Sequence, residues 1–251
     1  MEDLPVRCQV ERGVATITLD SPSNRNALST ALVAGLHAAL DQADRSDARV
    51  IVLTHTQPVF CAGADLKERN AGPTDSTHMA HAMERLITAR QPTIAAVEGP
   101  VRAGGVGLMA SCDLVVVRSD VTFAFTEVRI GVAPAIISVP VLRRCPWSKL
   151  AAPFLTGEHF DAAAARDVGL VTHVSDDVPI AVAHLVEGIL AGAPGAVAAT
   201  KSLLHHAGNS SLVAELTEMR ALSERLFAGD EAREGMTAFA ERRTPDWATD
   251  H

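Results

Sequence analysis

The sequence is poor in cysteine and contains no closely spaced cysteine pair. Its four cysteines are Cys8, Cys61, Cys112 and Cys145. Since zinc sites and redox dithiols usually carry CxxC pairs, this spacing predicts reduced, buried thiols and no metal site. His78, His81 and Glu84 would share one face of a helix, but such a trio is more often an ordinary helix surface than a metal site. The cysteine usage is typical of a cytoplasmic protein.

The sequence also has no strongly basic stretch and no long apolar run. Acidic residues outnumber basic ones by 30 to 22, which gives a formal net charge of −8. This balance disfavours nucleic acid and anionic membranes as partners. No run reaches the roughly 18 apolar residues of a membrane span, and the N-terminus lacks the apolar core of a signal peptide. We therefore expect a cytoplasmic protein with neither a membrane nor a nucleic-acid partner.

Strand and helix patterns alternate over residues 1–193. The chain of 251 residues is 47% hydrophobic, which is enough for one sizeable core. Alternation from Val6 to Leu19 predicts a β-hairpin, and Ser29 is placed to cap a helix that runs to about Ala43. Short apolar runs predict buried strands at Val50–Leu53, Thr93–Val97 and Leu114–Val117. This order predicts an α/β fold.

Residues 194–251 show only helical patterns. Helices are expected at 196–206, 211–227 and 230–242, separated by glycine-containing breaks. We therefore expect a core of residues 1–193 followed by a separate helical region.

A glycine-rich turn opens an apolar helix at Gly104-Gly105-Val106-Gly107. The spacing from Gly105 to Ala110 fits a dinucleotide fingerprint, but residues 98–103 separate the preceding strand from the glycines, which disfavours that interpretation. A glycine-opened helix start also presents free backbone amides to a developing negative charge, such as an enolate oxygen. Glycines that only allow close helix packing are the remaining alternative.

Two further segments carry candidate site residues. Small residues from Ala62 to Ala64 precede a helix that begins near Asp65, and Lys67 follows one turn later, either as a phosphate contact or as a solvated lysine. Glu127 follows an apolar alternating stretch that contains Phe123 and Phe125. Apolar surroundings would raise the pKa of this carboxyl by desolvation and suit it to acid–base chemistry. The alternative for Glu127 is an ion pair with Arg129.

Together, the segments 60–68, 92–117 and 123–134 resemble the enoyl-CoA hydratase/isomerase, or crotonase, family, and the resemblance extends over nearly the whole chain. It implies a spiral of ββα turns followed by a C-terminal helical region that forms trimers or pairs of trimers. It also implies an acyl-CoA thioester as substrate. No separate cofactor is expected, because coenzyme A is part of that substrate.

The resemblance also implies roles for individual residues. The backbone amides of Ala64 and Gly104 match the family's oxyanion hole, and Glu127 matches its second catalytic glutamate. The positions expected along the bound acyl-CoA are Ala62, Asp65, Lys67, Gly105, Gly107 and Arg242. A hydro-lyase that adds water to a 2-enoyl-CoA is therefore the leading hypothesis.

Gly107 departs from the family pattern, because the hydratases have their first catalytic glutamate there. The surrounding residues resemble those of bacterial methylglutaconyl-CoA hydratases, which suggests that a branched or carboxylated acyl chain occupies the vacated volume. Arg69, Arg102 and Arg129 are unranked candidates to bind a distal carboxylate. An isomerase that uses Glu127 alone and a non-catalytic acyl-CoA binding protein are the alternatives.

Overall fold

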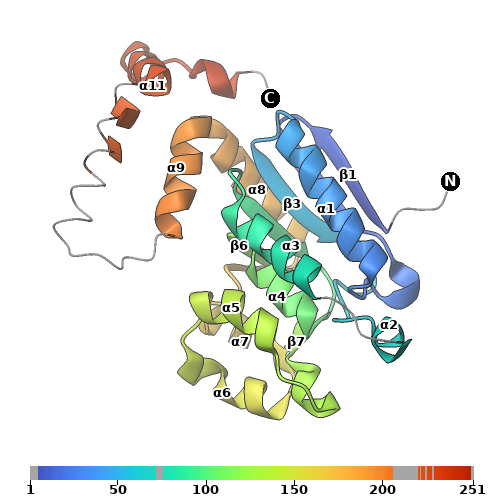
Figure 1. The fold of residues 1–251 in the computed structure, drawn as a ribbon. Helices are drawn as coiled ribbons and strands as arrows, with labels where there is room; N and C mark the ends of the chain where they lie inside the picture. Colours follow the sequence, from blue (N-terminus) through green and yellow to red (C-terminus); the bar gives the residue numbers. More distant parts are fainter. Residues whose placement is uncertain are drawn as a thin grey trace.

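A six-stranded sheet forms the centre of the structure, a computed structural model that describes residues 5–71, 76–205, 220, 222–223, 225–227 and 229–249 (Figure 1). The spatial order of the strands is β1 (Val6–Glu11), β2 (Val14–Leu19), β3 (Val50–His55), β4 (Thr93–Val97), β6 (Leu114–Arg118) and β9 (His173–Ser175). The first pair is antiparallel and every later pair is parallel. The carboxyl ends of the parallel strands therefore share one edge, where ligands bind in α/β folds. The α/β expectation is confirmed.

Local sequence signals explain the first elements of the fold. The β1–β2 hairpin turns at Arg12 and Gly13, whose φ angles are 48° and 74°. A two-residue turn with both φ angles positive matches the twist of the flanking strands, and glycine adopts it without steric cost. Helix α1 (Thr30–Arg45) begins where the Ser29 hydroxyl accepts a hydrogen bond from the Leu32 amide. Both sequence predictions are confirmed.

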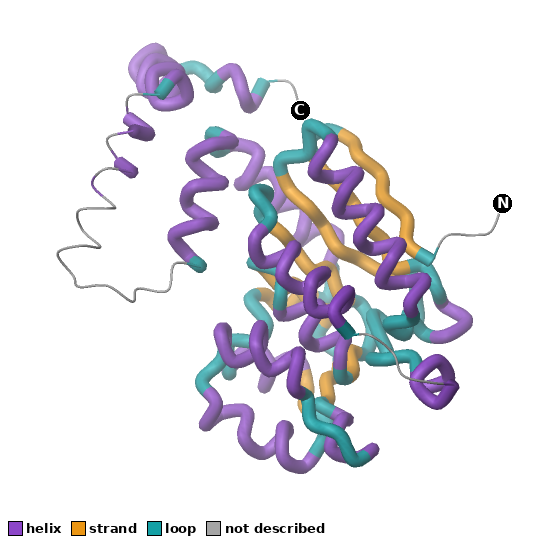
Figure 2. Tube along the Cα trace, viewed as in Figure 1, coloured by secondary structure: helices purple, strands orange, loops and turns teal. Residues whose placement is uncertain are grey.

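Different helices cover the two faces of the sheet. Helices α1 and α3 (Thr77–Thr88) lie over one face, and α8 (Val178–Ala191) packs against β3, β4 and β6 on the other (Figure 2). Successive residues of β3 alternate between the two cores, with Ile51 and Leu53 on the side of α1 and Val50 and Val52 on the side of α8. Burial on both faces explains the continuous apolar runs of these strands.

A smaller layer follows at the carboxyl ends of the main strands. Its three-stranded sheet has the order β5 (Val101–Arg102), β7 (Thr122–Ala124) and β8 (Phe160–Asp161). The surrounding helices are α2 (Leu66–Ala71), α4 (Gly104–Ala110), η2 (Thr126–Ile130), α5 (Ala135–Arg144), α6 (Trp147–Thr156) and α7 (Ala162–Asp167). Strand β5 leads directly into α4, so this layer positions the glycine-rich turn.

Every strand of the described residues precedes α8. The later described elements are α9 (Pro194–Leu204), α11 (Asp230–Glu241) and η3 (Asp246–Ala248). The helix expected over 211–227 lies largely outside the described residues, and the division between 193 and 194 stays a prediction. In the part of the chain that the structure describes, no single helix has the length and apolar character of a membrane span. Only α8 and α9 taken together, bent by 113° at their break, meet those criteria.

A buried ion pair attaches α9 to the core. The Lys201 ammonium lies 2.9 Å from Asp113 Oδ2 and donates to the backbone oxygens of Leu86 and Gln91 at 3.1 and 3.0 Å. The same Asp113 oxygen accepts the Thr93 amide at 2.7 Å. A buried charge is tolerated only when such partners replace its water, so this network holds α9 at the amino end of β4.

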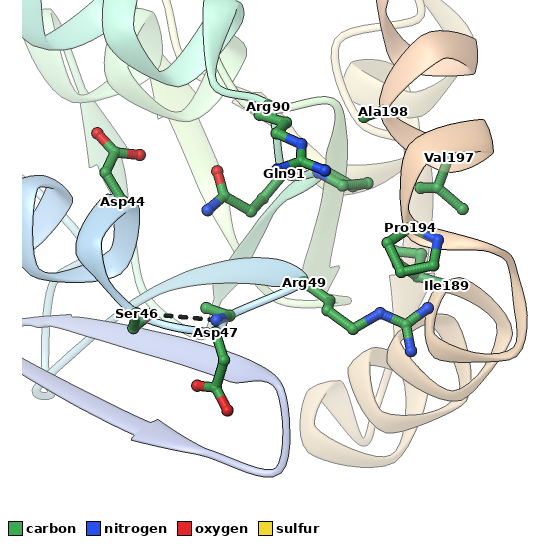
Figure 3. A pocket seen from close by; sticks show the side chains of 12 residues that line it. Asp44, Ser46, Asp47, Arg49, Arg90, Gln91, Ile189, Pro194, Val197 and Ala198 are labelled. Atoms are coloured by element: carbon green, nitrogen blue, oxygen red, sulfur yellow. Dashed lines mark hydrogen bonds between the residues drawn. The ribbon is translucent and has the colours of Figure 1, made fainter. Parts of the chain in front are cut away.

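Arg49 attaches the last described segment at the same edge of the sheet. It lies beside a cavity of about 380 Å³ formed where β3 and β4 begin, next to Ile189 and Pro194 (Figure 3). Its guanidinium donates to the backbone oxygen of Trp247 at 2.7 Å and to that of Gly192, and the Trp247 indole donates to the Ala191 oxygen at 3.1 Å. This cavity lies at the amino ends of the strands, opposite the edge expected for a ligand.

Candidate active site

Two segments that are far apart in the sequence meet at the carboxyl edge of the main sheet. Cys61 and Val101 form an isolated parallel bridge, and the Arg102 amide donates to the Cys61 oxygen at 3.0 Å. A Cβ on Gly63 would lie 2.8 Å from the Ala103 Cβ and 3.6 Å from the Gly104 nitrogen. The backbone around Ala64 and the backbone around Gly104 are therefore neighbours.

Glycine allows this close approach at two points. Gly63 has a φ of +95°, and a Cβ on Gly105 would lie 2.6 Å from the Cys61 Cβ. Ala103, which directly precedes α4, has a φ of 47° and a ψ of −121°. A non-glycine residue in such a conformation typically costs about 1–3 kcal/mol, and strain of this kind gathers at functional sites. A strained residue therefore lies directly before the first amides of α4.

The amides of Ala64 and Gly104 have no backbone acceptor among the described residues. Among the hydrogen bonds of the described residues, neither of these two N–H groups is a donor. Gly104 is buried and Ala64 half-buried, and buried backbone donors are nearly always satisfied, so these neighbouring amides are candidates to bind an external acceptor. This arrangement accords with the oxyanion roles expected for Ala64 and Gly104, which stay predictions.

Glu127 reaches the same place through the small sheet. Strands β5 and β7 pair, and the Ala103 amide donates to the Ala124 oxygen at 2.9 Å. The sequence placed Glu127 at the end of a strand, but β7 ends at Ala124 and Glu127 lies in the 3₁₀ helix η2. The strand stops there because β5, its partner, is only two residues long.

The Glu127 carboxyl is in an apolar setting. Its Oε2 atom is buried without a hydrogen-bond partner, and desolvation raises the pKa of this group above its ordinary value. None of the ion pairs between described residues involves Glu127, so the expected alternative of a pair with Arg129 is absent from the described part of the chain. A carboxyl with a raised pKa and an unsatisfied oxygen, three residues after the strand that is hydrogen-bonded to Ala103, is a candidate general acid and base.

The space beside Gly107 is filled by the protein itself. A Cβ on Gly107 would lie 2.5 Å from the Ile137 Cγ2, 2.6 Å from the Ile137 Cβ and 2.8 Å from the Met83 Cε. The expectation that an acyl chain occupies the volume directly beside Gly107 is therefore wrong. The glycine lets α4 and α5 pack closely, and the side chain of Ile137 stands where the glutamate of other hydratases would begin.

Apolar side chains also lie against Gly104. A Cβ there would lie 2.8 Å from both the Leu28 Cδ1 and the Met79 Cε. Sequence reasoning missed Leu28, Met79 and Ile137 as neighbours of the site, because their contacts join segments that are distant in sequence. Their apolar character marks them only as core residues.

Three of the residues expected along the bound acyl-CoA lie on α2 and the segment before it, whereas Gly105 and Gly107 lie in α4. Asp65 acts as the cap of α2, since its Oδ1 atom accepts the Lys67 amide at 2.9 Å. The Lys67 side chain is exposed, and the Ala62 amide donates to the Arg25 oxygen at 3.1 Å. The structure thus brings Ala62, Asp65 and Lys67 to the edge that carries Ala64. Their contacts with coenzyme A stay predictions.

Arg242 lies elsewhere in the same chain. It is exposed and ends α11 with a φ of 56°. Figure 1 shows α11 at the far end of the molecule from α2 and α4. The structure therefore does not bring Arg242 together with Lys67 and Gly104 within one chain.

The cysteines and histidines are not arranged as a metal site. Within the described ranges, no group of three or more His, Cys, Asp or Glu side chains could hold a metal ion. All four cysteines are free, and three are buried, but Cys8 is partly exposed, contrary to the sequence expectation. Cys8 is partly exposed because it lies on β1, the edge strand of the sheet, which has a neighbouring strand on only one side.

Comparison with known proteins agrees with this geometry. Residues 9–250 match the family model described as enoyl-CoA hydratase/isomerase. The chain is 32% identical to enoyl-CoA hydratase EchA19 of Mycobacterium tuberculosis, over 92% of this chain and 91% of the relative. It is also 32% identical to 2,3-dehydroadipyl-CoA hydratase of Escherichia coli, over 94% and 96%. The solved structure of Pseudomonas aeruginosa AtuE superposes with a TM-score of 0.91 at 33% identity, covering 98% of this chain and 100% of that one. The chain therefore belongs to the enoyl-CoA hydratase/isomerase, or crotonase, family of enzymes.

Proposed function

We propose that this protein adds water across the C2–C3 double bond of a 2-enoyl-CoA thioester. The observation that carries the proposal is the buried, unsatisfied carboxyl oxygen of Glu127, three residues after the strand that is hydrogen-bonded to the residue before Gly104. Hydration of a conjugated thioester needs one group that moves protons and one that stabilises an enolate oxygen. The site offers both.

In the proposed reaction the two amides donate hydrogen bonds to the thioester oxygen, where negative charge develops as the double bond is attacked. Ionised Glu127 accepts one proton from a water molecule while the water oxygen bonds to C3. The resulting enolate then takes that proton from Glu127 at C2. The water has then supplied the C3 hydroxyl and the C2 hydrogen, the double bond has become single, and no electrons have been exchanged.

Double-bond isomerisation is the second candidate. It is favoured by the glycine at position 107, where other hydratases have a glutamate. A single carboxylate can shuttle one proton between C2 and C4 through the same enolate, whereas hydratases of the family generally use two glutamates. The contacts of Gly107 with Ile137 and Met83 leave no second carboxylate at that position. Both reactions use Glu127, Ala64 and Gly104, so only the product distinguishes them.

The proposed acyl group is branched or carboxylated and resembles a glutaconyl chain. The Escherichia coli relative is named for 2,3-dehydroadipyl-CoA, which is a dicarboxylic thioester. A related Aspergillus fumigatus protein, 33% identical over 93% of this chain, is named mevalonyl-coenzyme A hydratase, after a branched acyl group. The thioester's phosphates would lie near Lys67, on the exposed start of α2.

The test of the function is turnover of 2-enoyl-CoA and 3-enoyl-CoA substrates in ¹⁸O-labelled water. A hydratase converts the 2-enoyl substrate into 3-hydroxyacyl-CoA that carries the label at C3. An isomerase instead interconverts the two enoyl substrates without taking up oxygen. If the protein binds these thioesters but converts none of them, it is an acyl-CoA binding protein and the proposal fails.

We also propose assembly into a trimer or a pair of trimers. Large apolar side chains are exposed on α6, α9 and α11, including Leu155 at 77%, Leu204 at 74% and Phe239 at 87%. Such groups are usually covered by another copy. Sedimentation at micromolar concentration should show three or six copies, and Phe239→Asp should shift the distribution toward smaller species. A monomeric wild type would contradict the proposal, and Arg242 would then have no partner copy through which to reach coenzyme A.

A further inference from the structure

A small cavity lies between α1, α2 and α3, next to the candidate oxyanion site. Its volume is about 150 Å³, and its lining includes Leu28, Val33, Arg69, Ser76 and Met79. Arg69 is the arginine in this lining, and its guanidinium donates to the Ser76 hydroxyl at 2.9 Å. The cavity therefore joins apolar walls with a cationic group.

Two residues connect this cavity to Gly104. Leu28 and Met79 line it, and the same two side chains lie within 2.8 Å of the position that a Cβ on Gly104 would occupy. One layer of apolar side chains thus separates the Gly104 amide from the cavity. Leu28 and Met79 therefore lie between Gly104 and the cavity that Arg69 lines.

The surroundings of the three candidate arginines differ, and this difference ranks them as possible binders of a distal carboxylate. Arg102 is occupied by the small sheet, since its guanidinium donates to the Val101 oxygen at 2.9 Å and to the Thr122 hydroxyl at 2.8 Å. Arg129, which is exposed as Arg69 is, lies beside the end of α6, where its Cγ is 3.0 Å from the position of a Cβ on Gly157. Of these three arginines, Arg69 is the one that lines a cavity against the residues that cover Gly104.

We propose that Arg69 binds the terminal carboxylate of a short dicarboxylic enoyl-CoA and so determines the acyl specificity of the enzyme. This inference rests on the proposed hydratase function. A guanidinium presents paired donors that fit a carboxylate, and Arg69, although exposed, lies at the rim of apolar walls. The apolar part of the cavity, lined by Leu28, Val33 and Met79, accommodates the methylene groups between the thioester and the terminal carboxylate.

The test compares 2,3-dehydroadipyl-CoA with 2-hexenoyl-CoA. These thioesters have the same six-carbon chain and differ at its end, which is a carboxylate in one and a methyl group in the other. The wild type should prefer the dicarboxylic substrate. Arg69→Gln should lower the ratio of the two kcat/KM values by roughly 10- to 100-fold, the effect of a charge-assisted hydrogen bond. Arg69→Lys, which keeps the charge but loses the paired donors, should fall between them.

Arg129→Gln is the matched control, since it removes the rival arginine and should leave the ratio unchanged. If Arg129→Gln collapses the ratio and Arg69→Gln does not, the assignment to Arg69 is overturned. If the wild type hydrates 2-hexenoyl-CoA as efficiently as the dicarboxylic substrate, the inference fails while the hydratase function stands.

A binding measurement separates this inference from the function itself. If neither thioester is hydrated, the proposed function fails, and calorimetry with saturated adipyl-CoA and hexanoyl-CoA then decides on the subsite. Tighter binding of adipyl-CoA that is lost in Arg69→Gln supports the assignment. Equal affinities in the wild type overturn it.

Discussion

Replacing Glu127 with glutamine should lower the rate of hydration by roughly 10²- to 10⁴-fold while the affinity for the thioester changes little. Glutamine keeps the shape of the side chain but cannot accept a proton from water. The amides of Ala64 and Gly104 belong to the backbone and are untouched, so a residual rate from enolate stabilisation should remain. Steady-state turnover of a 2-enoyl-CoA, with binding of the saturated analogue measured in parallel, provides the comparison.

Glu158→Gln is a matched control for this substitution. Glu158 is exposed on the segment after α6, and its replacement should leave turnover at the wild-type level. Near-normal turnover of Glu127→Gln would show that another group moves the proton. Glu127 would then be only a partly buried carboxyl of η2.

The pH dependence of the rate follows from the raised pKa of Glu127. Catalysis needs the ionised carboxylate as base, so activity should fall as the pH decreases through this pKa, which lies above the ordinary glutamate value. Glu127→Gln should lose this acidic limb, and its residual rate should be flat in the same range. An acidic limb that persists unchanged in the variant would assign the ionisation to a different group.

The same shift predicts an opposite effect on stability. Because the pKa of Glu127 is raised on folding, protonated Glu127 favours the folded state below the unfolded pKa, and this contribution is lost as the pH rises through the folded pKa. At neutral pH the ionised, unsatisfied carboxylate therefore destabilises the protein. Glu127→Gln should raise the urea midpoint at neutral pH, and the difference should shrink in acid. A variant that is less active but more stable cannot owe its loss of activity to misfolding.

Sequence patterns predicted those parts of the fold that depend on local interactions. The hairpin at Arg12 and Gly13, the cap at Ser29 and the strand Thr93–Val97 follow from turn chemistry, side-chain capping and apolar runs over a few residues. These signals do not require knowledge of distant neighbours. The structure therefore confirms them nearly residue for residue.

Long-range packing accounts for what sequence could not predict. Nothing near Gly107 indicates that Ile137, thirty positions later, lies against it, since that contact depends on how α4 and α5 cross. The sequence also does not predict the strained backbone of Ala103, because alanine rarely adopts a positive φ. Likewise Arg69, Arg102 and Arg129 carry the same charge in the sequence and differ only in what surrounds them.

Gly107→Glu, which restores the glutamate of other hydratases, should destabilise the protein by about 3 kcal/mol or more. Its Cβ would lie 2.5 Å from the Ile137 Cγ2, and overpacking of this kind typically costs about 1–3 kcal/mol. The carboxylate would also be buried without a partner, at a further cost of several kcal/mol. The better helix propensity of glutamate recovers only about 1 kcal/mol. Urea denaturation measures the net loss, and Gly107→Ala, which adds only the Cβ, should show a smaller loss of the same origin.

Ile137→Ala distinguishes packing from chemistry at this position. Alone it should cost about 2–5 kcal/mol, because it leaves a cavity between α4 and α5. Combined with Gly107→Glu it removes the atoms that clash, so the double variant should be more stable than the sum of the single changes predicts. The double variant should also hydrate crotonyl-CoA faster than Gly107→Glu alone, since a second carboxylate then has room beside Glu127. If Gly107→Glu is as stable as the wild type and its effect is additive with that of Ile137→Ala, the close packing against Ile137 does not explain the glycine. The loss of the first glutamate would then be a change in chemistry without a structural cause.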